Sequence, residues 1–391
     1  MGCGLSRGAD VGLVNKLLFA APDSSSYAAW SFKGELLWVP LAQYSSFGES
    51  SLRGPADDYV FPCRLLQCDK AEYLVIFYHK NADDLGSCKP FVEKIRSCLG
   101  VHVLVVEYPG YGLCSSSTAT AEQVNKHAFA AVEFAQTALG VPLRQIIVLG
   151  SCIGTGPAIT VAAELELAGL VLISPFLSVV QIFRDHLGGV LSKLVSEQFR
   201  NDVLIKSVRS PTLICHGKLD KLVPFAHAEQ LHRSLKCKAK LVDSSAANHH
   251  TNLLQDEQQF IAPMREFFDL PGSPSGKGLR VPAWAFLRRR HNDRVLLAKE
   301  AAEMDRLCSK QVGSPKVCDS MERGHGGEGC TRDKGGSSQQ SPRSPPVDAV
   351  SCSDGGSQRG PLCQTELLCG HGLEAALKLL WHRCGLLSRS S

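Results

Sequence analysis

A cysteine lies between two glycines in the sequence Gly-Ser-Cys-Ile-Gly at positions 150–154. This spacing is that of a nucleophile elbow, G-x-S-x-G, with cysteine in the place of serine. In an elbow the nucleophile lies on a strained turn between a strand and a helix, where side chains two residues to either side would collide. If Ser151 were the nucleophile, Leu149 and Ile153 would occupy the two glycine positions. Cys152 is therefore the candidate for nucleophilic attack on a carbonyl carbon.

A cysteine nucleophile needs a base that accepts its proton and an acid that orients the base. Asp220 follows an apolar run at 211–216, and two adjacent histidines, His249 and His250, follow the next apolar run at 239–243. The order nucleophile, acid, histidine is that of the triads that use this kind of elbow. We predict Asp220 as the acid and His249 as the base. His250 remains the alternative base, although it begins a segment that resembles the start of a helix.

An acyl-transfer intermediate carries a negatively charged oxygen, which two backbone N–H groups stabilise in an oxyanion hole. One N–H belongs to the residue after the nucleophile, here Ile153, and the other to a loop after an early strand. In this chain the early strand ends near His79, and Asn81 and Ala82 follow it. We therefore predict that Ile153 and either Asn81 or Ala82 form the oxyanion hole. His79 itself is expected to hold the loop rather than to act in catalysis.

Six short apolar runs have the length and composition of buried strands. They cover residues 73–79, 101–108, 145–150, 168–174, 211–216 and 239–243. Helical patterns lie between them, and the clearest extends over 121–139, where Thr120 and Gln123 form a capping box. Another helix is predicted directly after the elbow, over 155–166. Strands that alternate with helices predict an α/β fold with a doubly wound, mostly parallel sheet, whose catalytic groups lie at the carboxyl ends of the strands.

The chain divides into an N-terminal segment at 1–16, a domain at 17–270 and a low-complexity tail at 271–391. Within the domain, residues 175–210 form an apolar insert without a strand pattern. As a helical lid over the active site, this insert would line a channel for an acyl chain. As ordinary structure, it would pack against the sheet. The sequence is compatible with both interpretations.

The tail is rich in glycine, serine, proline and charged residues, above all at 311–362, and is predicted to be largely disordered. Short helices are expected in the basic segment 284–310 and in the apolar repeat at 373–384. A membrane-surface or partner-docking role for these helices is the less favoured interpretation. The cysteines and the histidine within 363–371 do not have the spacing of a zinc site, and we expect neither a metal nor a cofactor.

Length and composition are those of one enzyme-sized domain with a tail, because 44% of the 391 residues are hydrophobic. The formal net charge of +4 is too small to indicate a nucleic-acid-binding protein. Sixteen cysteines are scattered without paired spacing, which favours free thiols in a reducing compartment over a disulfide scaffold. No apolar run reaches the ~18 residues that a membrane-spanning helix needs, and no signal-peptide pattern opens the sequence.

The first residues, Met-Gly-Cys-Gly-Leu-Ser, have the pattern of an acylated N-terminus. Gly2 together with Ser6 fits N-myristoylation, and the adjacent Cys3 fits palmitoylation. A single myristoyl chain gives only marginal membrane affinity, whereas two acyl chains make a stable anchor. The sequence therefore predicts a peripheral protein that is lipid-anchored to the cytoplasmic face of a membrane.

Five segments, in this order along the chain, resemble the α/β-hydrolase domain-containing protein 17 group and its protist relatives. They are HKNADDLG at 79–86, EYPGYGL at 107–113, the elbow, the segment 216–220 and the loop of His249. The first two are far more specific than the elbow alone. The resemblance covers residues 17–270 and leaves the tail unexplained. It implies the α/β-hydrolase fold, a doubly wound and mostly parallel sheet with a helical lid insert.

The same resemblance implies a membrane-anchored serine hydrolase that removes palmitoyl groups from cysteines of other proteins. Its substrate would be an acylated protein or a lipid-like acyl ester, and Cys3 matches the acylated N-terminal segment of that group. Two positions depart from the group's pattern. The group has serine where this chain has Cys152, and glycine where this chain has Lys80. Glycine allows the backbone to bend close to the oxyanion, so we expect Lys80 to strain or reshape the hole.

The thiol of Cys152, paired with a histidine, is a competent nucleophile, and dienelactone hydrolase, of the same fold, also uses cysteine at its elbow. On a thioester substrate the first step exchanges one thioester for another, so we expect slow turnover and an accumulated acyl-enzyme. Three hypotheses follow: a Cys-His-Asp hydrolase of acyl thioesters or esters, a non-catalytic module that binds lipids or proteins at a membrane, and an acyltransferase. The retained Asp220 and His249 favour the first, whereas Lys80 and the substituted nucleophile favour the second.

Overall fold

The computed structural model describes most of the chain between residues 15 and 288. The described residues are 15, 18–41, 59–114, 119–251, 257–271, 276 and 278–288. The predicted lipidation sites Gly2 and Cys3 lie outside them, as does the tail beyond residue 288 with its expected disorder and short helices. No helix within the described ranges is long and apolar enough to cross a membrane.

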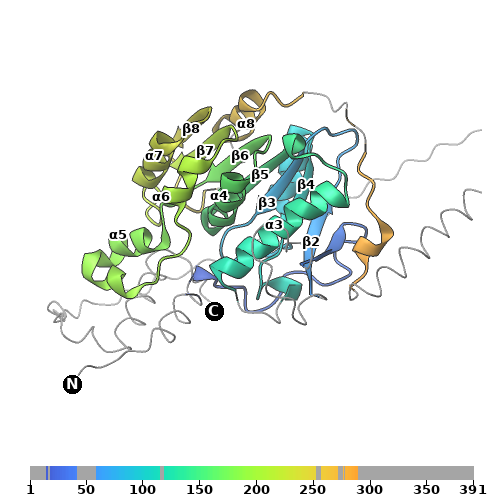
Figure 1. The fold of residues 1–391 in the computed structure, drawn as a ribbon, viewed down its shortest axis with the longest axis horizontal. Coiled ribbons are helices and arrows are strands. Elements are labelled where there is room, and N and C mark those ends of the chain that lie inside the picture. Colours follow the sequence, from blue (N-terminus) through green and yellow to red (C-terminus); the bar gives the residue numbers. More distant parts are fainter. Residues whose placement is uncertain are drawn as a thin grey trace, which may run out of the picture.

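One eight-stranded sheet forms the centre of the structure (Figure 1). Its strands are β1 (Leu36–Pro40), β2 (Val60–Leu66), β3 (Leu74–Tyr78), β4 (His102–Val106), β5 (Ile146–Ser151), β6 (Gly169–Ile173), β7 (Thr212–Gly217) and β8 (Ala239–Ser244). They are hydrogen-bonded in the order β1-β2-β4-β3-β5-β6-β7-β8. β2 is antiparallel to both of its neighbours, and the strands from β4 to β8 are parallel. The six strands predicted from apolar runs are confirmed as β3 to β8.

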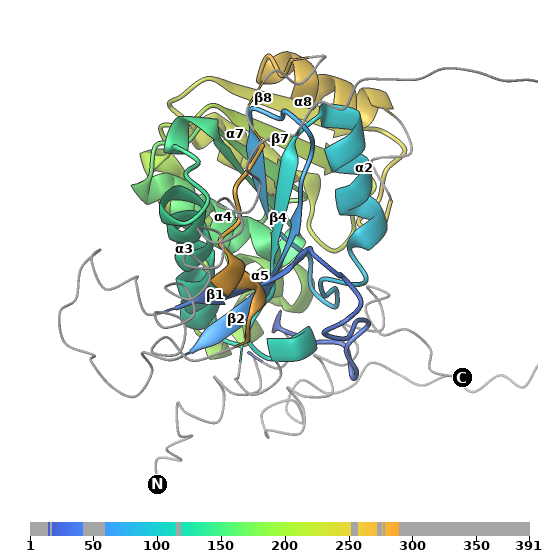
Figure 2. The same ribbon diagram turned by 90° about the vertical axis from the view of Figure 1, so that its right-hand side faces the viewer.

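Helices cover both faces of this sheet (Figures 1 and 2). On one face pack α3 (Ala121–Thr137), α4 (Thr155–Glu164) and α7 (Phe225–Ser234), and on the other α2 (Lys89–Leu99) and α8 (Ile261–Phe267). Alternate residues of each central strand therefore enter different hydrophobic cores, which is why the strands appear in the sequence as continuous apolar runs. This sheet order between two helical layers is the α/β-hydrolase fold, as predicted.

The two antiparallel strands β1 and β2 were not predicted. β1 is an isolated five-residue apolar run, too short for its periodicity to distinguish strand from helix. β2 contains Pro62, which argues against a central strand, and Arg64, whose charge argues against burial. Burial of Arg64 is possible because its guanidinium forms ion pairs with Glu35 at 2.8 Å and Glu93 at 3.0 Å. These partners lie far away in the sequence, so no local pattern shows them.

The two helices that frame the site begin where the sequence predicts. α3 starts after Thr120, whose side chain accepts a hydrogen bond from the Gln123 N–H at 3.2 Å, so this half of the predicted capping box is confirmed. α4 begins at Thr155, directly after the elbow. Both helices end two residues before their predicted ends, a difference within the usual uncertainty of helix boundaries.

The insert at 175–210 is helical, as predicted. It contains α5 (Val179–Leu191) and α6 (Asn201–Leu204), joined and followed by short 3₁₀ turns. Phe176 and Phe183 are buried in the same core as α3 and α4. The insert therefore packs against one face of the sheet.

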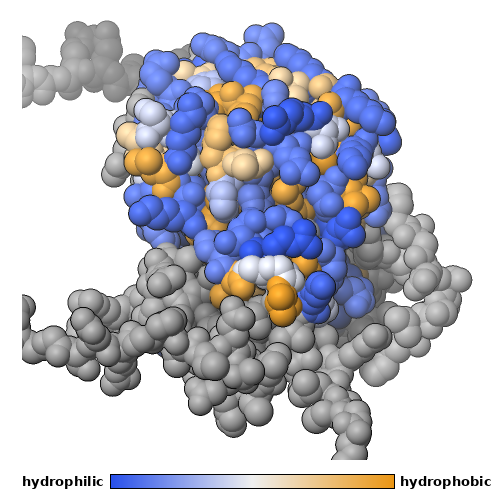
Figure 3. Space-filling view, turned by 90° about the vertical axis from the view of Figure 1, so that its left-hand side faces the viewer, coloured by the Kyte–Doolittle hydropathy of each residue, from blue (hydrophilic) through white to orange (hydrophobic). Residues whose placement is uncertain are grey.

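Two polar contacts fix α5 to neighbouring segments. The His227 Nδ1 accepts a backbone N–H, so its Nε2 carries the proton and donates to Asp185 of α5 at 2.6 Å. His186 of α5 donates to the carbonyl of Leu222 at 2.8 Å, in the loop after β7. On the side of the molecule that carries α5 and α7, apolar residues are interspersed among hydrophilic ones (Figure 3).

Residues 278–288 return to the domain rather than leaving it. Ala283–Phe286 form a 3₁₀ turn, and the Trp284 ring packs edge-on against Phe134 of α3 with centroids 5.9 Å apart. The Arg288 guanidinium lies 4.7 Å above the ring of Trp38 in β1. The described start of the basic segment is thus folded against the domain.

Candidate active site

The predicted site residues all follow the carboxyl ends of parallel strands. Asn81 follows β3, Cys152 follows β5, Asp220 follows β7 and His249 follows β8. Parallel strands place their carboxyl ends at one edge of the sheet, so four segments that are distant in sequence meet there.

Cys152 occupies the strained turn that the elbow pattern predicts. Its φ of 53° lies in the left-handed region, which is uncommon for a residue with a side chain. A Cβ at Gly150 would collide with the backbone of Gly154, and a Cβ at Gly154 would collide with the carbonyl oxygens of Tyr78 and His79 in β3. The two glycines are therefore required by close backbone contact.

We expect Gly154→Ala to destabilise the fold by roughly 1–3 kcal/mol, because the added methyl group meets backbone that cannot move aside cheaply. The free energy of unfolding from denaturant titration measures the effect. Gly189→Ala is the matched control, since a Cβ there meets no atom within 4 Å. Equal unfolding midpoints for the two variants would contradict the steric argument.

Cys152, His249 and Asp220 form a hydrogen-bonded chain. The Cys152 Sγ lies 3.2 Å from the His249 Nε2, and the His249 Nδ1 lies 2.7 Å from the Asp220 Oδ2. Because the Asp220 oxygen accepts, the Nδ1 carries a proton and the Nε2 faces the sulfur. The imidazole and the carboxyl are both almost fully buried. This is the geometry by which a base accepts a thiol proton while an acid holds its orientation.

Asp220 is held by more partners than the sequence indicates. Its Oδ1 accepts the N–H groups of Leu222 at 2.9 Å and Val223 at 2.8 Å. The Nε2 of His216, at the end of β7, lies 3.4 Å from Oδ2 and donates to the Val223 carbonyl at 2.9 Å. Burial by itself would raise the pKa of Asp220, but the hydrogen bonds from His216, His249 and the backbone hold it well below its usual range. Asp220 is therefore a carboxylate.

His249 has the opposite shift. Burial by itself would lower the pKa of His249, but the negative charge at Cys152 and the hydrogen bond to Asp220 outweigh it and raise the pKa to about 10. When the Cys152 sulfur carries a negative charge, the imidazolium form of His249 is therefore favoured. A proton taken from the nucleophile stays on His249 until a leaving group accepts it.

His250 is oriented differently. Its ring is nearly perpendicular to that of His249, at 88° with centroids 5.6 Å apart. Its backbone N–H donates to the Asn248 side chain at 2.9 Å. The structure thus places His249, and not His250, between Cys152 and the acid.

Replacing His249 by alanine should lower the rate of acylation of Cys152 by roughly 10³-fold or more, because no other group accepts the thiol proton. His250→Ala should lower it by less than tenfold, since the ring that lies against the Cys152 sulfur is that of His249. Stopped-flow measurement with an activated ester compares the two variants. A larger loss in His250→Ala would assign the base to His250.

The two loop residues predicted for the oxyanion hole differ in whether another group already accepts a hydrogen bond from their backbone N–H. The Ala82 N–H donates to the Asn81 Oδ1 at 3.0 Å, and Ala82 has a φ of 61°. The Tyr111 hydroxyl donates to the same Asn81 oxygen at 2.7 Å. The Ala82 N–H is therefore engaged, which leaves the N–H groups of Asn81 and Ile153 as the candidates. The contact of Ala82 with its own neighbour is not visible in the sequence.

Comparison with known proteins identifies a matching family and several relatives. Residues 113–250, which contain Cys152, Asp220 and His249, match the model of the dienelactone hydrolase family. The human protein named alpha/beta hydrolase domain-containing protein 17B is 26% identical over 270 residues, 65% of this chain and 90% of that protein. The resemblance to the protein 17 group is confirmed.

Other relatives of this chain are similarly distant in sequence. The Caenorhabditis elegans alpha/beta hydrolase domain-containing protein aho-3 is 28% identical over 203 residues, which are 52% of this chain. The match spans only 59% of the length of aho-3. Among solved structures, the Pyrococcus furiosus esterase Pf2001 aligns over 65% of this chain and 100% of its own, with 15% identity and a TM-score of 0.48.

A cleft of about 230 Å³ opens beside Cys152 in this α/β-hydrolase homologue. It is bordered by the ends of the parallel strands and by the start of α2, including Cys88 and Phe91. Among the described residues, none of the insert at 175–210 lines it. The structure therefore supports the packing interpretation of the insert over the lid.

Lys80 lines the cleft with 46% of its side chain exposed, and its Nζ lies 3.9 Å from Asp83. In this loop the left-handed φ falls at Ala82 and not at Lys80. The departure from glycine thus changes the chemistry of the cleft wall, and the expected backbone strain at Lys80 is not observed. Within the described ranges, no group of three or more His, Cys, Asp or Glu side chains could hold a metal ion.

Proposed function

We propose that this chain is a cysteine-dependent acyl hydrolase in which Cys152 attacks the carbonyl carbon of an ester or thioester. The observation that carries the proposal is the continuous hydrogen-bonded chain from the Cys152 sulfur through His249 to Asp220. The confirmed resemblance to α/β hydrolases supports it.

Two steps complete the reaction. The Cys152 sulfur forms a bond to the carbonyl carbon, and the oxyanion accepts hydrogen bonds from the N–H groups of Asn81 and Ile153. The His249 imidazolium then gives its proton to the departing alcohol or thiol as the bond to the leaving group breaks. In the second step His249 takes a proton from water, and the water oxygen forms a bond to the acyl carbon. The bond from that carbon to the Cys152 sulfur then breaks, which releases the acid and leaves a thiolate beside the His249 imidazolium.

The proposed substrate is the palmitoyl thioester of another protein's cysteine, at the cytoplasmic face of a membrane. The resemblance to the protein 17 group supports the substrate, and the N-terminal pattern of Gly2 and Cys3 supports the membrane anchor. Transfer from a thioester to Cys152 is nearly thermoneutral, because one thioester replaces another. Hydrolysis therefore depends on the second step, and an acyl-enzyme is expected to accumulate.

Intact-protein mass spectrometry after incubation with a palmitoyl thioester tests this function. A palmitoyl adduct is expected on wild type, absent from Cys152→Ala, and decaying with time. Cys237→Ala is the matched control, because Cys237 is half-buried and does not line the cleft. It should keep the adduct.

Two alternatives have defined outcomes in this experiment. A non-catalytic module that binds lipids or proteins at a membrane is favoured by Lys80 and by the substituted nucleophile, and it predicts no adduct on folded wild type. An acyltransferase predicts an adduct that is stable in water and disappears when a thiol or amine acceptor is added. Either result would replace the hydrolase proposal.

A further inference from the structure

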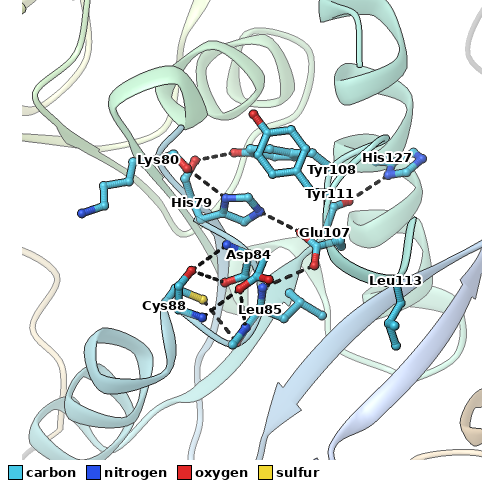
Figure 4. A network of polar contacts seen from close by, with 12 residues as sticks. His79, Lys80, Asp84, Leu85, Cys88, Glu107, Tyr108, Tyr111, Leu113 and His127 are labelled. Atoms are coloured by element: carbon cyan, nitrogen blue, oxygen red, sulfur yellow. Dashed lines mark hydrogen bonds and ion pairs between the residues drawn. The ribbon is translucent and has the colours of Figure 1, made fainter. Parts of the chain in front are cut away.

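A buried pair of opposite charges lies behind the oxyanion loop (Figure 4). The His79 Nε2 is 3.2 Å from the Glu107 Oε1, and both side chains are completely buried. Neither residue lines the cleft beside Cys152. Removing two ionisable groups from water costs free energy unless they are paired and hydrogen-bonded. The burial of this pair therefore calls for an explanation.

The surrounding donors and acceptors define the protonation of the pair. The His79 Nδ1 lies 3.0 Å from the Lys80 carbonyl, which only accepts, so Nδ1 carries a proton. The Glu107 Oε2 accepts from the Tyr27 hydroxyl at 2.7 Å and the Leu85 N–H at 3.3 Å, which leaves Oε1 to accept from the His79 Nε2. Burial by itself would lower the pKa of His79, but the hydrogen bond and charge of Glu107 raise it. The raised pKa favours the imidazolium form of His79 beside Glu107.

Glu107 is itself held through both its side chain and its backbone carbonyl. The Leu113 N–H donates to the Tyr27 oxygen at 3.2 Å, so the Tyr27 hydroxyl proton is directed to Glu107. The His127 Nδ1 donates to the Glu107 carbonyl at 2.9 Å. The carboxylate therefore has a single orientation, with Oε1 toward His79.

The loop is held on the other side of His79. The His79 Nδ1 donates to the Lys80 carbonyl, and the Tyr108 hydroxyl donates to the His79 carbonyl at 2.7 Å. The Tyr111 hydroxyl donates to the Asn81 side chain at 2.7 Å. The His79 carbonyl and the Asn81 side chain are thus held by two tyrosines from the segment that follows β4, and the Lys80 carbonyl is held by His79 itself. These bonds set the direction of the Asn81 N–H.

We propose that Glu107 is a positioning residue that acts through His79 on the loop 80–82. Its effect is to aim the Asn81 N–H at the oxyanion that forms when Cys152 attacks. The inference rests on the proposed function. It adds that the buried ion pair serves transition-state geometry as well as folding, with Glu107 never touching the substrate.

Two reactions of Cys152 separate this role from a purely structural one. With p-nitrophenyl acetate, the sulfur forms a bond to the acetyl carbon and p-nitrophenolate leaves, through an oxyanion that needs the hole. With iodoacetamide, the sulfur forms a bond to the methylene carbon and iodide leaves, with no oxyanion. The Cys152→Ala variant gives the background from other cysteines, which is subtracted in both reactions.

Glu107→Gln removes the carboxylate charge while keeping the size of the side chain. We expect the second-order rate of acetylation of Cys152 to fall on the order of 10²-fold, because the Asn81 N–H is no longer directed at the oxyanion. The rate of alkylation by iodoacetamide should stay within twofold of wild type. Glu166→Gln is the matched control, since it removes an exposed carboxylate that pairs with Arg209 ahead of β6 and β7, at the edge of the sheet opposite the site. Both of its rates should match wild type.

Two results would overturn the proposal. One is unchanged acetylation in folded Glu107→Gln, and the other is an equal fall in both rates, which would show general disruption of the site. Wild type that is alkylated at Cys152 but never acetylated would overturn the proposed function itself, and the positioning role with it. If Glu107→Gln does not fold, Tyr27→Phe tests the same carboxylate, because it removes the hydroxyl that donates to the Glu107 Oε2. It should lower acetylation roughly 10-fold with alkylation unchanged, and equal rates would overturn the proposal.

Discussion

Replacing Cys152 by alanine is expected to lower the rate of hydrolysis of an activated ester by roughly 10³-fold or more. The physical reason is that His249 and Asp220 form a chain that ends at the Cys152 sulfur. Without the sulfur, the remaining oxyanion hole and base act only on water. Steady-state hydrolysis of p-nitrophenyl acetate, corrected for the reaction of other cysteines, measures the change.

Cys152→Ser sharpens this prediction because it restores the residue that the elbow pattern has in serine hydrolases. The hydroxyl is a weaker nucleophile than the thiol and depends more strongly on the base. We expect activity above that of Cys152→Ala, through an acyl-serine ester in place of the acyl-cysteine thioester. Equal rates in wild type and Cys152→Ala would remove Cys152 from the mechanism, whatever the serine variant does.

The second large effect is expected for Asp220→Asn. An amide in this position no longer stabilises the imidazolium of His249, and its N–H₂ group faces donors. We expect the rate of hydrolysis to fall by about 10⁴-fold, as for a triad whose acid is replaced by its amide. Asp243→Asn is the matched control, because that exposed carboxylate pairs with Lys218 on the protein surface. It should leave the rate within twofold.

The same substitution should change stability in a pH-dependent way. Removing one partner of a buried pair costs about 3 kcal/mol in the free energy of unfolding at neutral pH. The pKa of Asp220 is lower in the folded protein than in the unfolded chain. Its contribution is therefore present above the unfolded value of about 4 and is lost as the pH falls toward the folded value.

Urea titrations of wild type and Asp220→Asn at several pH values test this sign. The difference between their unfolding free energies should be largest near neutral pH and should narrow below about pH 4. A difference that grows with acidity would show that Asp220 is protonated in the folded protein. That outcome would also contradict its role as the orienting acid.

The sequence by itself determined the features that depend on local contacts. The glycines at 150 and 154 identified the elbow because each lies where a Cβ would meet backbone atoms. The apolar runs predicted the six parallel strands because both faces of β3 to β7 are buried and β8 packs apolar side chains against both cores. The chain order of Cys152, Asp220 and the histidine pair followed from strands whose carboxyl ends share one edge. Residue type, spacing and chain order suffice to predict such features, even where the contact itself joins distant segments, as it does between Gly154 and Tyr78.

Only the tertiary structure decided which of two neighbouring residues serves in the site and what role a buried residue has. His249 and Cys152 are 97 positions apart, and their contact depends on strand order and register, which also turn His250 aside. The Ala82 N–H is excluded from the oxyanion hole by its bond to the Asn81 side chain. Glu107 was visible only as part of a motif, and its charge acquired a role because folding removed it from water and placed His79 against it. Such choices depend on distances of a few ångströms between segments far apart in the chain, and sequence spacing does not contain them.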